Sequence, residues 1–70
     1  MAKFTLVGVD GNAFAVMGYT ANALRRAGLK DEVKTMQDKA MSSDYDNLLR
    51  VCVEYVDKAN EALGLTDEED

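Results

Sequence analysis

The sequence contains no histidine, no proline and no tryptophan, and it has a single cysteine among its 70 residues. Histidine is the commonest general base and a frequent metal ligand, so its absence excludes histidine-based catalysis and histidine-containing metal sites. One cysteine cannot form a disulfide within the chain. We therefore expect no enzymatic activity, no bound cofactor and no metal ion.

A long apolar run is also missing. A transmembrane helix needs about 20 consecutive apolar residues, whereas the longest candidate, residues 4–17, is interrupted at Gly8, Asp10 and Asn12. The same interruption and the lack of a small-residue cleavage pattern argue against a secretory signal. Because a lone thiol stays reduced in the cytoplasm, we expect a cytoplasmic protein that does not bind membranes.

The chain has 13 acidic and 8 basic residues, but the acids are unevenly placed. Four of them occupy positions 67–70, so the remainder of the chain is nearly neutral. Nucleic acid binding requires a basic face, and Arg25-Arg26 is the one adjacent basic pair, so we expect no direct contact with nucleic acid. The composition is that of a foldable chain. It predicts one small domain over residues 1–65 and an acidic, disordered tail over 66–70.

The N-terminal part of the chain predicts a strand. Residues 4–9 are rich in β-branched and aromatic side chains and precede the turn-forming pair Asp10-Gly11. Two continuations fit that turn. A two-residue hairpin would return residues 12–16 as a second strand. We favour a helix over residues 12–27, because the apolar residues recur at helical spacing and alanine prefers helices.

End signals and apolar stripes delimit three helices. Asn12 is expected to cap the first, and Gly28 to end it with Leu29 folding back in a Schellman motif. The second is predicted over residues 31–41, and the third from an N-cap at Ser43 to Gly64. The apolar stripe of the second helix is Val33, Met36, Ala40 and Met41. The apolar face of the third is Leu48, Leu49, Cys52, Tyr55, Val56, Ala59, Ala62 and Leu63.

The predicted fold is mainly α, within the α+β class: a short N-terminal strand followed by three helices in a small bundle. A single strand leaves its backbone donors and acceptors unpaired. Either the hairpin strand is present, or the strand pairs with its copy in another subunit. We expect a homodimer, because a chain of this size buries only about 60% of its unfolded surface on its own.

Patterns that resemble ligand loops fail at required positions. Gly8, Gly11 and Gly18 match neither the dinucleotide fingerprint nor the Walker pattern. Residues 44–47 begin like a calcium loop, but leucines follow where an oxygen ligand and a glycine are needed. Cys52 falls within an apolar helix face and is expected in the core rather than as a nucleophile. We therefore assign no catalytic, cofactor-binding or metal-binding residues.

Two helix faces are candidate partner-binding surfaces. The outer face of the third helix carries the carboxylates Asp46, Glu54, Asp57 and Glu61. One interpretation is that this row imitates the charge spacing of a phosphate backbone. The alternative is a solvated face in which Arg50 and Lys58 form i, i+4 ion pairs with the acids.

The second surface lies on the first helix, where small residues stand at exposed positions. These residues are Ala15, Gly18 and Asn22. Glycine costs about 1 kcal/mol relative to alanine inside a helix. Gly18 therefore indicates either close packing of another chain or a kink.

The segments GNAFAVMG (residues 11–18) and SDYDNLL (residues 43–49) resemble short uncharacterised proteins of bacteriophages and integrated mobile elements. The resemblance covers most of residues 7–56 and carries no catalytic residues. It implies a small accessory protein that binds and blocks a host enzyme or effector complex, as anti-CRISPR proteins do. The alternative is a structural or regulatory homo-oligomeric subunit without inhibitory activity.

Overall fold

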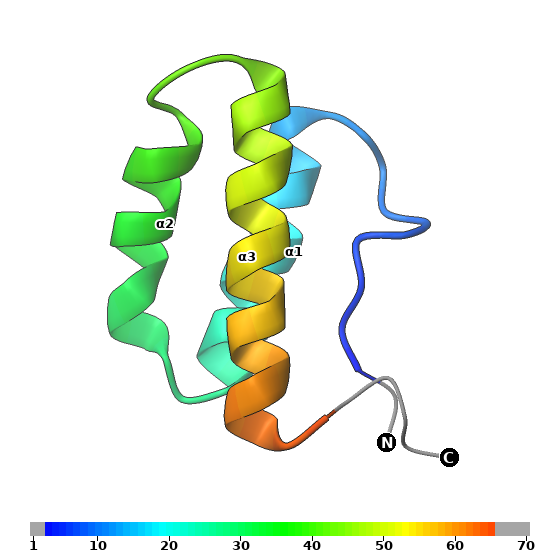
Figure 1. Cartoon of the computed structure of the whole chain (residues 1–70), viewed down its shortest axis with the longest axis vertical. Coiled ribbons are helices and arrows are strands. Elements are labelled where there is room, and N and C mark those ends of the chain that lie inside the picture. Colours follow the sequence, from blue (N-terminus) through cyan, green and yellow to red (C-terminus); the bar gives the residue numbers. More distant parts are fainter. Residues whose placement is uncertain (1–2, 66–70) are drawn as a thin grey trace.

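The computed structural model describes residues 3–65, which form a three-helix bundle (Figure 1). Helix α1 spans Ala13–Arg26, α2 spans Val33–Ala40 and α3 spans Tyr45–Leu63, with a 3-10 turn, Lys30–Glu32, before α2. Helices α1 and α3 run in the same direction and α2 runs opposite to both (Figure 1). The mainly helical prediction is confirmed. The predicted tail, residues 66–70, lies outside the described residues.

The predicted ends of α1 are confirmed. The Asn12 side chain accepts a hydrogen bond of 2.8 Å from the Ala15 N–H, which caps the helix. At the other end, Gly28 has φ +78, and the Leu29 N–H donates to the Leu24 carbonyl at 2.8 Å. This is the Schellman arrangement. Because the chain enters α1 at Asn12, the alternative hairpin strand over residues 12–16 does not form.

The cap of α3 is Asp44 rather than Ser43, which corrects the sequence prediction. The Asp44 carboxylate accepts from the Asn47 N–H at 3.0 Å. Ser and Asp are comparably good caps, so local preference does not choose between adjacent positions. Asn47 supplies the choice, because its side-chain amide donates to the Lys39 carbonyl at the end of α2, at 3.0 Å. With Asp44 as the N-cap, Asn47 therefore forms hydrogen bonds at both the start of α3 and the end of α2.

This N-cap gives a pair of predictions. Asp44→Ala should lower the free energy of unfolding by about 1 kcal/mol through the lost cap, whereas Ser43→Ala should have almost no effect. Urea unfolding of the two variants beside the parent protein measures the difference. Equal destabilisation by both, or a larger loss for Ser43→Ala, would contradict the observed cap.

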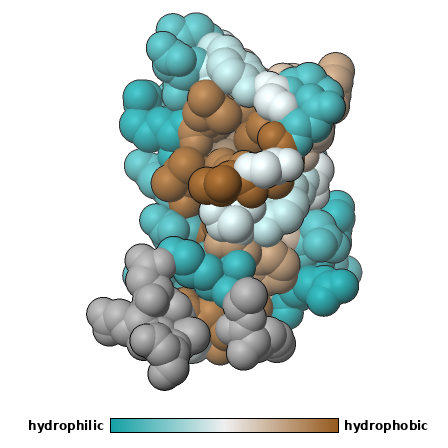
Figure 2. Space-filling view, turned by 90° about the vertical axis from the view of Figure 1, so that its right-hand side faces the viewer, coloured by the Kyte–Doolittle hydropathy of each residue, from teal (hydrophilic) through white to brown (hydrophobic). Residues whose placement is uncertain are grey.

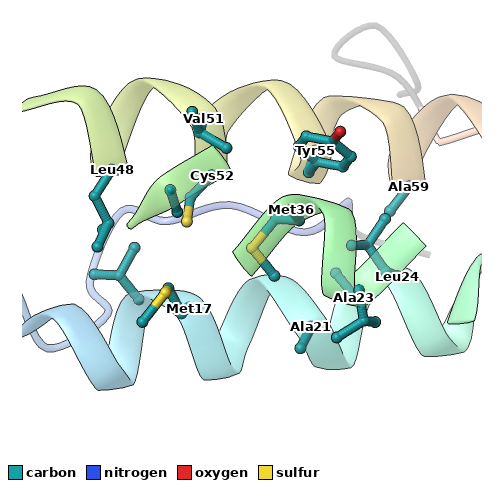
Figure 3. Packing of buried hydrophobic residues seen from close by; sticks show 13 residues of the cluster. Met17, Ala21, Ala23, Leu24, Met36, Leu48, Val51, Cys52, Tyr55 and Ala59 are labelled. Atoms are coloured by element: carbon teal, nitrogen blue, oxygen red, sulfur yellow. The ribbon is translucent and has the colours of Figure 1, made fainter. Parts of the chain in front are cut away.

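The core is formed by all three helices (Figure 3). Met36 and Cys52 are buried, as their apolar stripes predicted, and Met17 of α1 is buried as well. The buried apolar residues are Val16, Met17, Ala21, Ala23, Leu24, Val33, Met36, Ala40, Leu48, Val51, Cys52, Tyr55, Val56 and Ala59.

Four predicted core positions differ from the structure. Met41 is 64% exposed because α2 ends one residue before it. Ala62 and Leu63 are exposed in the last turn of α3, and Leu49 is half-buried at the margin of the core. The inward face of α3 is therefore centred on Leu48, Cys52 and Tyr55.

Residues 4–9 do not form a strand, and no strand occurs within residues 3–65. Residues 6–9 form a turn, and the backbone of Phe4 before it pairs with the side chain of Asn60 on α3. The Phe4 N–H donates to Asn60 Oδ1 at 2.8 Å, and Asn60 Nδ2 donates to the Phe4 carbonyl at 2.9 Å. One side-chain amide thus makes the two bonds that a neighbouring strand would make.

Further local bonds explain why the segment needs no sheet. The Thr5 N–H donates to the Tyr19 hydroxyl at 2.9 Å, and the Phe4 and Tyr19 rings pack edge to face with centroids 6.0 Å apart. The Val9 N–H donates to the Leu6 carbonyl at 3.1 Å across a turn in which Gly8 has φ +87. That turn interrupts the run predicted as a strand.

The segment lies along one side of the bundle, beside α3 (Figure 1). Asn60 holds its beginning near the end of α3, and the Tyr45 hydroxyl donates to the Gly11 carbonyl near the start of α3. Since these contacts pair the backbone within one chain, the unpaired-strand argument for a homodimer no longer holds.

Candidate functional site

A shallow groove of about 160 Å³ lies between the N-terminal segment and α3. Its walls are mainly apolar. The lining residues are Lys3, Phe4, Thr5, Leu6 and Val7 on one side, and Val53, Val56 and Asp57 on the other. Figure 2 shows apolar side chains gathered on this side of the molecule, along which the N-terminal segment runs.

The groove carries two strongly exposed aliphatic side chains. Val7 is 86% exposed at the turn of the segment, and Val53 is 47% exposed on the outer side of α3. Single exposed aliphatic residues are ordinary, but a contiguous exposed apolar surface with a polar rim is typical of an interaction site. Val7 and Val53 line one small groove whose other residues include Asp57 and Lys3, so an apolar surface with a charged margin is exposed here.

The carboxylates of Asp46, Glu54, Asp57 and Glu61 are all exposed on α3, as the sequence predicts. From Glu54 onward, successive carboxylates are separated by three or four residues in the sequence. This spacing places them on one helix face. Asp57 belongs to both features, since it lines the groove as well. The acidic row, which we define as these four carboxylates, therefore borders the groove.

The cations that were expected to neutralise the acidic row bind elsewhere. Arg50 donates to the Asn47 side chain at 3.1 Å. Lys58 donates to Glu32 at 3.0 Å, and this hydrogen bond raises the pKa of Lys58. The ion pairs formed between residues 3–65 are Lys34–Asp38 and Lys58–Glu32. Neither pair involves the acidic row. The predicted i, i+4 pairs on α3 are absent from this part of the chain.

The second predicted surface lies on α1, separate from the acidic row. Asn22 and Gly18 are exposed and Ala15 is half-buried. A Cβ atom on Gly18 would meet nothing within 4 Å, and α1 continues through this position. Within the described chain nothing packs closely there. Phe14, one turn earlier, is 83% exposed, so this face also presents an unpartnered aromatic ring.

Cys52 is a core residue, as predicted, with no exposed surface. Burial raises the pKa of its thiol, and a hydrogen bond with the Thr20 side chain lowers that pKa by less. The Thr20 hydroxyl itself donates to the Val16 carbonyl at 2.9 Å. A protonated, enclosed thiol is a poor nucleophile.

This burial predicts slow alkylation of Cys52. Iodoacetamide should label the native protein more slowly than the unfolded chain, by about 1,000-fold for each 4 kcal/mol of opening free energy. The same burial makes stability depend on pH. The thiol of the unfolded chain loses its proton at a lower pH than the buried thiol, so the free energy of unfolding should decrease as the pH rises through 9.0, the ordinary pKa of cysteine. Mass spectrometry of timed samples measures the labelling. Equal rates in buffer and in guanidinium would show an accessible thiol.

Comparisons with known proteins add no relatives: no family model, curated protein or solved structure matches the chain. Across residues 3–65, no group of three or more cysteine, aspartate or glutamate side chains is placed to hold a metal ion. None of the helices in that part of the chain combines the length and apolarity of a membrane span.

The sequence located the acidic row but missed the groove. Val53 fell outside the predicted apolar face, and Val7 was assigned to a strand. One signal was available: Val53 is an apolar residue one turn before Asp57 on a face otherwise rich in charge.

Proposed function

We propose that the chain is a non-enzymatic protein-binding module of a bacteriophage or mobile element that inhibits a host defence or nucleic-acid-handling complex, as anti-CRISPR proteins do. The observation that carries the proposal is the acidic row on α3, which is exposed and makes no ion pair within residues 3–65. The resemblance to short phage proteins over residues 7–56 supplies the expected setting.

The physical basis is competition for a basic surface. A groove that receives nucleic acid is lined by lysine and arginine, which attract any row of exposed negative charges. Glu54, Asp57 and Glu61 stand on consecutive turns of α3 and Asp46 stands two turns before Glu54. They present such a row without requiring the chain to reorganise. Binding there would exclude the nucleic acid, so inhibition needs no catalytic residue.

The test reverses charge on and off the row. The partner is first captured from a lysate of the bacterial host on the immobilised protein. The double variant Glu54→Lys with Glu61→Lys should then abolish capture. The matched control, Asp31→Lys with Asp38→Lys, changes the net charge equally at exposed sites before and within α2 and should retain the partner.

Salt provides a second readout on the same complex. Exposed charges are screened over about 8 to 10 Å at physiological ionic strength, so affinity should decrease steeply as salt is raised. A partner whose affinity changes neither with salt nor with the Glu54 and Glu61 reversal would refute the nucleic-acid-mimic function.

The second candidate, a homo-oligomeric structural or regulatory subunit, is favoured by α1. Phe14 is 83% exposed and stands one turn before the open position at Gly18. A ring of one subunit packing over the glycine of another would bury both. Sedimentation equilibrium decides this candidate: a dimer lost in Phe14→Ser supports it, and the monomer mass for the parent protein rejects it.

A further inference from the structure

We infer that the groove between residues 3–7 and α3 receives one large aliphatic side chain from a basic segment of the partner protein. The inference deepens the proposed function and rests on it, because it names the chemistry of the partner that α3 binds. It joins two neighbouring features: an apolar groove and a row of carboxylates that Asp57 connects to it.

The size of the groove fits a single side chain. Its volume is about 160 Å³, and an apolar cavity of about 150 Å³ is known to hold a benzene molecule. A leucine, isoleucine or methionine side chain is of similar bulk. A whole helix face or a cofactor would not fit, so the groove provides an anchor point within a larger contact.

The lining explains why the anchor should be aliphatic. Val7, Val53 and Val56 supply branched aliphatic surface, and Phe4 and Leu6 complete the apolar wall. Val7 and Val53 are both substantially exposed, so part of this surface is in water when no partner is bound. Covering it with an aliphatic group gains hydrophobic free energy in proportion to the area removed from water.

The charges explain why the residues beside the anchor should be basic. Asp57 lines the groove one turn beyond Val53, and Glu61 follows one further turn along α3. Among the described residues that line the groove, Lys3 is the single cation. Arg50 lies one turn before Val53 on α3. The four carboxylates of the acidic row outnumber these two cations, so residues that flank the anchor would meet an excess of negative charge along α3, where lysine and arginine are preferred.

The same charges disfavour a second copy of this chain as the occupant. Two copies joined through this face would place their acidic rows against each other, and juxtaposed like charges are costly at an interface. The exposed basic pair Arg25 and Arg26 lies on α1, in its last turn, rather than beside the groove. A different protein with a basic segment is the better complement.

The first experiment uses a defined peptide and the whole chain labelled at its valine methyl groups. The probe is an end-capped pentapeptide with a central leucine between two pairs of lysines. We expect it to shift the methyl signals of Val7 and Val53 while those of Val33, buried in α2, stay unchanged. Peptides with serine at the centre, or with glutamates as flanks, should produce little or no shift. Equal shifts with leucine and serine would overturn the inference.

The second experiment uses substitutions at matched exposed apolar sites. Val53→Ser should weaken binding of the lysine–leucine peptide about tenfold. Met41→Ser removes a more exposed apolar side chain, next to the end of α2, and should leave binding unchanged. The dispersion of the core methyl signals verifies that both variants are folded. Unchanged affinity in Val53→Ser, or equal losses in both variants, would overturn the inference.

The captured partner separates this inference from the proposed function. If reversal of Glu54 and Glu61 abolishes capture but Val53→Ser does not weaken it, the acidic row binds the partner and the groove inference is wrong. If Val53→Ser weakens capture and charge reversal does not, the apolar anchor is supported while the nucleic-acid-mimic function fails. Weakened capture in both variants supports the groove inference and the proposed function together.

Discussion

Replacing Leu24 with alanine is expected to lower the free energy of unfolding by about 2 to 5 kcal/mol. Leu24 has no exposed surface and is among the largest fully buried side chains of the bundle (Figure 3). Its removal costs both the transfer free energy of the lost atoms and the cavity left among the helices. Native domains are stable by roughly 0.05 to 0.15 kcal/mol per residue, so for a short chain this loss approaches the total.

Urea unfolding followed by circular dichroism measures the change. The matched control is Leu63→Ala, which makes the same substitution at a side chain that is 40% exposed in the last turn of α3. That variant should lose much less stability than Leu24→Ala. Equal losses at the two sites would mean that the three helices do not pack around Leu24.

Asn60→Ala is expected to detach the N-terminal segment and to lower stability by about 1 to 3 kcal/mol. Asn60 is 4% exposed and makes both hydrogen bonds to the Phe4 backbone. Each intramolecular hydrogen bond contributes about 0.5 to 1.5 kcal/mol net, and a buried group left unpaired costs more. The groove should be lost as well, because the detached segment forms one of its walls.

Hydrogen exchange distinguishes detachment from general unfolding. In Asn60→Ala the amide of Phe4 should lose its protection while the amides of α1 and α3 in the core keep theirs. Asn22→Ala, at an exposed position of α1, is the control: it should raise stability slightly, because alanine is the better helix former, and should leave the protection of the Phe4 amide unchanged. A Phe4 amide that stays protected in Asn60→Ala would contradict the role given to this side chain.

The helices were predictable because their signals are local. Asn12, Gly28 and Gly64 act within one turn of themselves, and each ends or begins a helix where the sequence places it. The predicted N-cap of α3 was wrong by one residue, because Ser43 and Asp44 are both good caps. Contacts of Asn47 with α2 select Asp44, and such contacts between helices are not visible in a short window of sequence.

The N-terminal strand failed for a different reason. The composition of residues 4–9 indicates a strand, but residues 6–9 form a turn around Gly8. Composition also does not say what pairs with the backbone before that turn. Asn60 lies 56 residues away, and nothing in its local context marks it as a surrogate strand. The groove was missed for the same reason. One of its walls comes from this segment and the other from α3, which is far away in the sequence. The acidic row needed only helical periodicity and was predictable.

The bond between Phe4 and Asn60 also orders the events of folding. It joins the two ends of the described chain, 56 residues apart, whereas neighbouring helices are joined through short turns. Closing a longer loop costs more chain entropy. This cost is offset only when both ends are in position to form their contacts. The helices should therefore associate first and the segment should dock last. It follows that the groove is the final surface to appear as the chain folds and the first to disappear when the chain opens locally.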